Sequence, residues 1–238
     1  MSATSKADDN ECIRVVVRCR PMSKKETKEG RKSIVVIDNE AKSVSIRNPD
    51  NENEPPKTFK FDASYDDKTQ QRIFFDKSCS CMVEDALEGF NSTIFAYGQT
   101  GCGKSFTMQG PSTSSEDLKG VIPNCFSHIF DFVKASKDVQ FLIHCQYLEL
   151  YNEEIKDLLV TDKISNKLNL SEDPQKGMNV SGITNMPVES PEDLMKMLDR
   201  GLGKLMHATS QSQSSHRRYA LYMACLLYTS PSPRDAHE

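Results

Sequence analysis

The segment from residue 98 to residue 105 constrains this chain more than any other, and it reads Gly-Gln-Thr-Gly-Cys-Gly-Lys-Ser. It fits the pattern G-x-x-x-x-G-K-[ST], in which glycines let consecutive backbone N–H groups turn toward phosphate oxygens. In this pattern Lys104 reaches the β- and γ-phosphates, and the hydroxyl of Ser105 binds Mg²⁺. The segment therefore predicts a site for a nucleoside triphosphate and its magnesium ion, held by Gly98, Gln99, Thr100, Gly101, Cys102, Gly103, Lys104 and Ser105.

The flanking residues decide between a phosphate-binding loop and an ordinary glycine-rich turn. Residues 93–97 form a short apolar run with β-branched and aromatic side chains, which favours a buried strand that leads into the loop. From Gly103 onward the sequence predicts the first turn of a helix, whose N-terminal dipole would face the anion. Because strand, loop and helix follow in the order that the motif requires, we expect an α/β P-loop NTPase fold with a mixed central sheet flanked by helices.

Composition limits the kind of protein. The 238 residues are enough for one α/β domain with a sizeable core, and a net charge of −4 gives no global basic field for nucleic acid or membrane surfaces. The eight cysteines are scattered, which favours free thiols in a reducing cytosol. Cys79 and Cys81 could be metal ligands, but no second ligand pair lies at a useful spacing, so we favour core cysteines on a helix.

The hydrophobic pattern predicts the elements around the loop. Strands are expected where apolar and β-branched residues run together or alternate, at 13–20, 33–37, 43–46, 58–65, 93–97, 141–151, 168–170 and 178–183. Helices are expected where apolar residues recur every three or four positions, at 70–90, from 103, at about 120–133, at 152–159 and from 190. Ser190 followed by Pro191 and Asp193 is a specific signal for the start of the last helix.

Three stretches resemble the kinesin motor domain. The first is residues 91–108, where the similarity extends through both flanks of the phosphate loop, and the second is 147–159, to which we assign a scaffold role. The third is Arg18-Cys19-Arg20-Pro21, which resembles the kinesin motif beside adenine and ribose. Two guanidinium groups and a proline ring offer flat surfaces for stacking on a purine. Without the loop downstream, the same residues would indicate only a strand end with solvated arginines.

The resemblance implies a function. It implies an ATPase that binds ATP and Mg²⁺ and couples hydrolysis to movement along microtubules, in the cytoplasm and on the cytoskeleton, with no nucleic acid and no membrane insertion. In it Lys104 offsets the phosphate charge, and no general base is needed because phosphoryl transfer rests on positioning and charge stabilisation. A full-length parent would dimerise through a coiled coil that this chain lacks. The microtubule contact is expected near Lys163, Lys167 and Lys176.

The resemblance covers about 13–206 and then degrades. Kinesins continue with switch I, Ser-Ser-Arg-Ser-His, whose serines help to hold Mg²⁺ and the attacking water; Ser214 and Ser215 can be matched to them, and Arg217 is the nearest arginine. The switch II segment Asp-Leu-Ala-Gly-Ser-Glu, which senses the γ-phosphate, does not occur in the chain. We therefore expect this chain to bind nucleotide poorly, to hydrolyse it slowly and not to move.

These observations predict three segments: a disordered tail at 1–11, a partial motor domain at 12–225 that equals the N-terminal two-thirds of a motor, and a non-native tail at 226–238. The last segment contains Ser-Pro repeats and resembles translated adapter or vector sequence; a frameshifted or alternatively spliced end is the alternative. Two other functions stay open. One is a non-motile nucleotide-binding fragment, and the other is a small-molecule kinase or GTPase, although a guanine-recognising Asn-Lys-x-Asp motif is absent.

Overall fold

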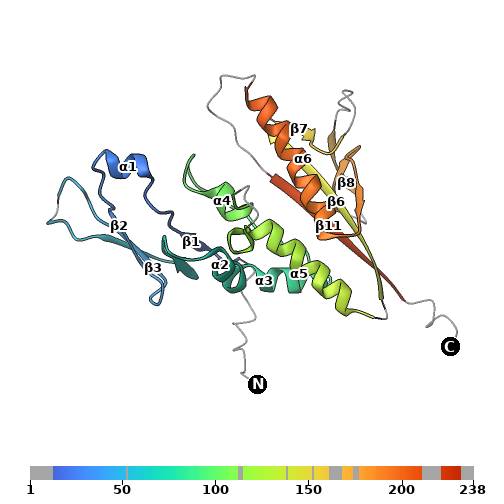
Figure 1. Ribbon diagram of the computed structural model, residues 1–238, viewed down its shortest axis with the longest axis horizontal. Coiled ribbons are helices and arrows are strands. Elements are labelled where there is room, and N and C mark those ends of the chain that lie inside the picture. Colours follow the sequence, from blue (N-terminus) through green and yellow to red (C-terminus); the bar gives the residue numbers. More distant parts are fainter. Residues whose placement is uncertain are drawn as a thin grey trace. The chain divides into compact units, whose positions relative to one another are not determined.

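The computed structural model describes residues 13–51, 53–111, 115–137, 139–151, 153–160, 168–173, 177–210 and 221–231. The chain divides into two compact units, the first formed by 1–84 with 92–124 and the second by 85–91 with 125–238 (Figure 1). Parallel and antiparallel strand pairs both occur, and the described strands form four separate sheets. Helices and strands are both present along the chain, in runs rather than in strict alternation. Among the described helices, none combines the length and the apolar character that a membrane crossing requires.

The described residues of the first unit form five short strands. β1 (Val16–Arg18) pairs in parallel with β5 (Ala63–Tyr65), and β2 (Val35–Asp38), β3 (Ser43–Ile46) and β4 (Lys57–Lys60) form an antiparallel sheet. The predicted hairpin is confirmed, and the Asp38 carboxylate stabilises its turn by accepting the backbone N–H groups of Glu40 and Ala41. Two predictions are wrong in part. β1 is shorter than expected and has one partner among the described strands, and β4 is exposed at every position rather than half-buried.

The helices around the loop are α1 (Lys24–Lys28), α2 (Gln71–Ser78), α3 (Ser80–Leu87), α4 (Lys104–Met108) and the short 3₁₀ helix η1 (Glu116–Leu118). The single helix expected at 70–90 is therefore wrong, because it is divided at Cys79. The Ser80 hydroxyl donates to the carbonyl of Asp76, four residues earlier, a bond that bends helices. The expected apolar stripe is confirmed at Phe75, Cys79 and Val83, while Phe90 is exposed.

The strand expected at 93–97 does not form, and this is the largest difference from the sequence prediction. The segment has no regular structure, and its aromatic side chains are among the most exposed large hydrophobic side chains of the described residues, at 79% for Phe95 and 90% for Tyr97. A strand needs neighbours to accept and donate its backbone hydrogen bonds. No described strand pairs with this segment, so these apolar residues are not part of any described sheet.

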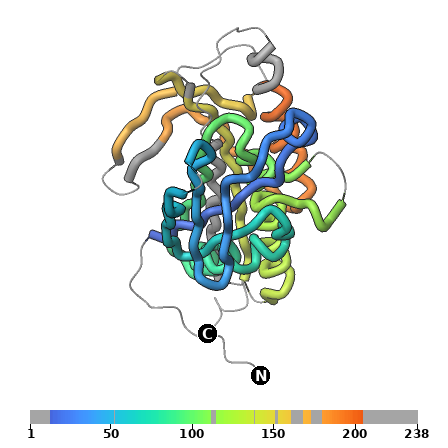
Figure 2. Tube along the Cα trace, turned by 90° about the vertical axis from the view of Figure 1, so that its left-hand side faces the viewer, coloured from blue at the N-terminus to red at the C-terminus, as the bar shows by residue number. Residues whose placement is uncertain are grey.

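The second unit is built on the long strand β6 (Val139–Tyr151). In it β6 pairs antiparallel with β7 (Glu154–Asp157), β10 (Met186–Val188) and β11 (Leu221–Pro231). The pair β8 (Asn169–Asp173) and β9 (Gly177–Ser181) forms a separate hairpin, visible in orange in Figure 2. Helix α5 (Val121–Ala135) crosses the boundary between the units, and α6 (Pro191–Ser210) packs on β6. The predictions of β6, of the β8–β9 pair and of helices near 120 and from 190 are confirmed.

The helix expected at 152–159 is wrong. Residues 154–157 are strand β7, which turns back along β6 with Tyr151 opposite Glu154. Glu153 adopts a left-handed backbone with φ 66°, a conformation that suits a tight hairpin turn and interrupts a right-handed helix. Asn152, which would cap a helix at this position, lies outside the described residues. Glu149 is buried within β6, at 6% exposed.

Strand β11 includes part of the segment that we interpreted as a non-native tail. It lies antiparallel along β6, from Leu221 opposite Glu149 to Pro231 opposite Val139. Strand pairing uses backbone groups that every residue except proline supplies in full, so it does not depend on the origin of the sequence. The boundary at residue 226 therefore stays a prediction, and the expected disordered tail at 1–11 lies outside the described residues.

Candidate nucleotide-binding site

The loop backbone takes the conformation that the glycine pattern predicts. Gly98, Gly101 and Gly103 have positive φ angles of 148°, 80° and 101°, which side-chain-bearing residues rarely adopt. The backbone N–H of Cys102 donates to the carbonyl of Gln99 over 3.2 Å and closes a turn inside the loop. A Cβ added at Gly98 would lie 2.5 Å from Cys102 Sγ. The backbone conformation thus favours glycine at position 98, and a side chain there would also have to displace Cys102 Sγ.

The helix expected after the loop forms, but it is short. α4 contains five residues, with Gly103 as its N-cap, and the backbone N–H of Thr107 donates to the Gly103 carbonyl over 2.9 Å. Ser105, the expected Mg²⁺ ligand, is in the first turn and is exposed, as are Gln99 and Thr100. Its hydroxyl is therefore accessible to a hydrated cation.

Lys104 turns its side chain back onto the loop. Its Nζ donates to the carbonyl of Gly98 over 2.7 Å and to that of Gln99 over 2.9 Å, and Cys102 Sγ lies 3.9 Å away. An ammonium group, a glycine-rich loop with positive φ angles and an accessible hydroxyl are features that a site for MgATP requires, so these residues fit the ligand. To bind a phosphate, however, Lys104 has to exchange two carbonyl acceptors for phosphate oxygens.

Arg18 lies among protein groups rather than at an open surface. Its Nη1 donates to Gln71 Oε1 over 2.6 Å and to Thr107 Oγ1 over 3.2 Å, and its Nη2 donates to the carbonyl of Thr69 over 3.1 Å. The guanidinium carbon also lies 4.9 Å from the centre of the Phe74 ring. Burial lowers the pKa of Arg18 from its ordinary value, because desolvation disfavours the charged form.

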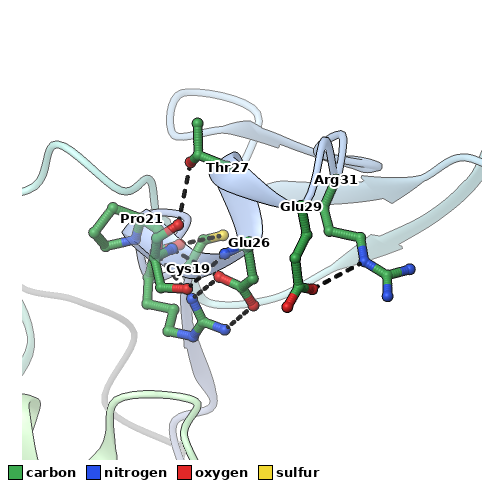
Figure 3. A network of polar contacts seen from close by, with 8 residues as sticks. Cys19, Pro21, Glu26, Thr27, Glu29 and Arg31 are labelled. Carbon is green, nitrogen blue, oxygen red and sulfur yellow. Dashed lines mark hydrogen bonds and ion pairs between the residues drawn. The ribbon is translucent and has the colours of Figure 1, made fainter.

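Arg20, two residues further, has a different environment. It forms a bidentate ion pair with Glu26, at 2.8 Å for Nη1 to Oε2 and 2.6 Å for Nη2 to Oε1, and both side chains are about one-third exposed. Figure 3 shows this network beside α1, where Glu26 also accepts the backbone N–H of Ser23 in a capping box. The hydrogen bond from Arg20 holds the pKa of Glu26 well below its usual range. Pro21 is exposed, and its carbonyl accepts from Arg20.

Sequence reasoning did not identify Gln71, which connects several parts of the site. It is 3% exposed, and its Nε2 donates to the carbonyl of Phe106 in α4 over 2.6 Å and to that of Leu118 in η1 over 3.3 Å. A signal was present in the sequence, because Gln71 and Ser78 lie at helical spacing with the buried Phe74 and Phe75. A polar residue on an apolar stripe indicates a buried hydrogen-bonding role.

The remaining candidates are outside the described residues. They are the switch I serines Ser214 and Ser215 and the lysines expected to face microtubules, Lys163, Lys167 and Lys176. The free cysteines include Cys19, Cys79, Cys81, Cys102, Cys125 and Cys145, and within the described chain no three metal-ligating side chains gather.

Comparison with known proteins adds the identity of the domain. The protein-family model of the kinesin motor domain matches residues 18–236. The chain is 38% identical over 221 residues to kinesin-like protein KIF3C of Mus musculus, covering 92% of this chain and 28% of that protein. It is 41% identical over 214 residues to kinesin-like protein klp-20 of Caenorhabditis elegans, covering 89% of this chain and 33% of that protein. The chain thus spans 28% and 33% of the length of these two relatives.

Proposed function

Because the chain belongs to the kinesin motor domain family, we propose that its phosphate loop binds MgATP and that the whole protein hydrolyses ATP to move along microtubules. The observation that carries the nucleotide site is the loop itself. Three glycines with positive φ curl residues 98–103 so that Lys104 Nζ lies within 2.9 Å of two carbonyls of that loop. A cation at this position is suited to a polyphosphate chain.

Each residue of the site has a role in this proposal. The loop N–H groups and Lys104 hold the phosphates, Ser105 binds Mg²⁺, and the metal offsets charge on the phosphate oxygens. Arg20 and Pro21 lie beside the base, and Ser214 and Ser215 act as the switch I serines. No side chain takes a proton from water as a general base, since charge stabilisation and positioning supply the rate enhancement.

The 238-residue chain itself is proposed to bind nucleotide weakly and to hydrolyse it slowly. Two features support this. Lys104 has to give up two carbonyl partners before it can bind phosphate, and the unpaired 93–97 segment does not anchor the loop to a sheet. A loop without that anchor has to be ordered when the ligand binds, which lowers affinity. A non-motile nucleotide-binding protein is the alternative that these features favour.

The partners and location follow the same proposal. Microtubules are the proposed track, the cytoplasm and its cytoskeleton are the proposed location, and the whole protein is proposed to dimerise through a coiled coil. Neither nucleic acid nor membrane insertion has a role in it.

The test is titration of the purified chain with a fluorescent ATP analogue in the presence of Mg²⁺, with ATP and GTP as competitors. We expect weak binding that Lys104→Ala abolishes and that ATP displaces. Lys77→Ala, which removes an exposed lysine from α2, is the matched control and leaves binding unchanged. Absence of binding at millimolar nucleotide would contradict the site, and displacement by GTP as readily as by ATP would favour the GTPase alternative.

A second measurement tests the activity of the chain. Phosphate release is followed with and without microtubules, and co-sedimentation is measured in parallel. We expect slow release that microtubules do not accelerate. A microtubule-stimulated rate would show that the chain is a working motor domain and that the proposed impairment is wrong.

A further inference from the structure

We propose that Arg18 is a positioning residue for the phosphate loop rather than a contact for the base. In this assignment Arg18 and Gln71 hold α4, the helix that follows the loop, and thereby fix Lys104 and Ser105. The assignment rests on the proposed nucleotide site but adds a role that can be tested without nucleotide.

Three of the five N–H groups of Arg18 donate to protein acceptors. A terminal guanidinium nitrogen carries two N–H groups, and both on Nη1 are used, by Gln71 Oε1 at 2.6 Å and Thr107 Oγ1 at 3.2 Å. Nη2 donates to the carbonyl of Thr69 at 3.1 Å. Hydrogen bonds from a charged donor in a half-buried position are costly to release. A purine would have to displace them to recruit this side chain.

Two aromatic rings also lie close to the Arg18 guanidinium. Its central carbon lies 4.9 Å from the centre of the Phe74 ring and 5.5 Å from that of the Phe106 ring. Phe74 is 6% exposed, so it is part of the core, whereas Phe106 belongs to α4. Stacking of a base on Arg18 requires a free flat face, and these rings compete for it.

Gln71 completes the attachment of α4. Both hydrogens of its amide are donated, to the carbonyls of Phe106 and Leu118, while its oxygen accepts from Arg18. The five-residue helix is thus held at the hydroxyl of Thr107, at the ring of Phe106 and at the carbonyl of Phe106. A helix of this length is not stable alone, so its position depends on such contacts.

Arg20 provides the contrast. Its Cβ lies 3.7 Å from the position that a Cβ would take at Gly103, so Arg20 lies against the loop. Its side chain is 36% exposed and is held by the ion pair with Glu26. Of the two arginines, Arg20 is therefore the one that a bound nucleoside can reach. The two substitutions should have different signatures: Arg18→Ala should affect phosphate binding, and Arg20→Ala should affect recognition of the nucleoside.

The first experiment compares a ligand that has a base with one that lacks it. Binding of ATP and of inorganic tripolyphosphate is measured for the wild-type chain, Arg18→Ala and Arg20→Ala. We expect Arg18→Ala to lower the affinity for both ligands by the same factor, about tenfold or more. Arg20→Ala should lower the affinity for ATP alone. If Arg18→Ala lowered the affinity for ATP but left the affinity for tripolyphosphate unchanged, the assignment would be overturned.

The second experiment needs no nucleotide and separates this assignment from the proposed function. Alkylation of Cys102, half-buried in the loop, reports loop mobility, and the exposed Cys81 on α3 is the internal control. We expect Thr107→Val, which removes one partner of Arg18 and preserves side-chain shape, to speed labelling of Cys102 several-fold and to leave Cys81 unchanged. An unchanged Cys102 rate would overturn the positioning role even if nucleotide binds. Faster labelling in a chain that binds neither ligand would support it while the proposed function fails.

Discussion

At the scale of single residues, environment separates side chains that the sequence presents as equivalent. Arg18 and Arg20 belong to one motif, yet one is enclosed by Gln71, Thr69 and Thr107 and the other forms an ion pair at the surface. Residue type alone predicts a cation at both positions. The partners depend on which elements pack beside the end of β1, and only the folded chain supplies them.

Cys79 and Cys81 also differ in environment, although they lie two residues apart, and this difference leads to a prediction. Burial raises the pKa of the Cys79 thiol to about 12, and this side chain is 4% exposed, whereas Cys81 is exposed. Since the thiolate is the reactive form, iodoacetamide at about pH 8 should label Cys81 and leave Cys79 unmodified. Mass spectrometry of the two positions checks this, and labelling of Cys79 should appear in urea. Equal rates in the native chain would show that Cys79 is accessible.

At the scale of elements, the local sequence pattern correctly predicted the helices and strands that carry their own signal or pair with a neighbour in the sequence. The β2–β3 hairpin, the β8–β9 pair and the amphipathic helices α5 and α6 all carry their own signals. The strand predicted at 93–97 and the helix predicted at 152–159 were wrong, because the structure of both segments depends on pairing with other parts of the chain.

The start of α6 provides a test of a local signal. Ser190 Oγ accepts the backbone N–H of Asp193 at 3.2 Å and donates to its carboxylate at 2.8 Å. Ser190→Ala should reduce the free energy of unfolding by about 1 kcal/mol, because a helix N–H loses its partner. Urea denaturation measures the change, and Ser190→Thr, which keeps the hydroxyl, should retain most of the stability. A loss in the threonine variant as large as in the alanine variant would argue against capping.

Two glycines of α6 give a matched pair for packing. A Cβ at Gly201 would lie 2.0 Å from Cε1 of Tyr147, a ring with no exposed surface, whereas Gly203 has no atom within 4 Å of that position. Gly201→Ala should therefore destabilise the chain by about 1–3 kcal/mol through overpacking. Gly203→Ala should stabilise it by up to about 1 kcal/mol through helix propensity. Thermal unfolding compares the two, and a change of the same sign in both variants would contradict close packing of Gly201 on Tyr147.

At the scale of the whole molecule, the chain has the fold of a P-loop NTPase of the kinesin family, and it is divided into two compact units. Carboxylates that are hydrogen-bonded in the folded state occur in both units. The pKa is lowered for Glu26 by Arg20, for Asp66 by the Thr69 hydroxyl and for Asp193 by the Ser190 hydroxyl. All three side chains are partly exposed to water, so each contributes modestly.

These shifts predict how stability depends on pH. A carboxylate whose pKa is lowered by folding stabilises the folded chain when the pH is above the ordinary pKa of that group. This contribution is lost as the pH falls from the ordinary pKa to the lowered pKa. The ordinary values are 4.5 for Glu26 and 3.8 for the two aspartates, so stability should begin to fall below about pH 4.5. Urea denaturation at a series of pH values measures this. Glu26→Gln should be less stable than the wild type near neutral pH, and the difference should shrink in acid; a constant difference would exclude the Arg20–Glu26 pair as its cause.

The phosphate loop, the resemblance to the kinesin family and the elements with a local signal all follow from the residue pattern. Glycine spacing, hydrophobic period and capping residues act over a few positions, so their consequences can be worked out without the rest of the chain. Three features follow only from the folded chain: 93–97 pairs with none of the described strands, 154–157 returns along β6, and Gln71 joins Arg18 to α4. Each of these depends on backbone or side-chain partners that are distant in sequence, and a hydrogen bond exists only where folding brings its donor and acceptor together.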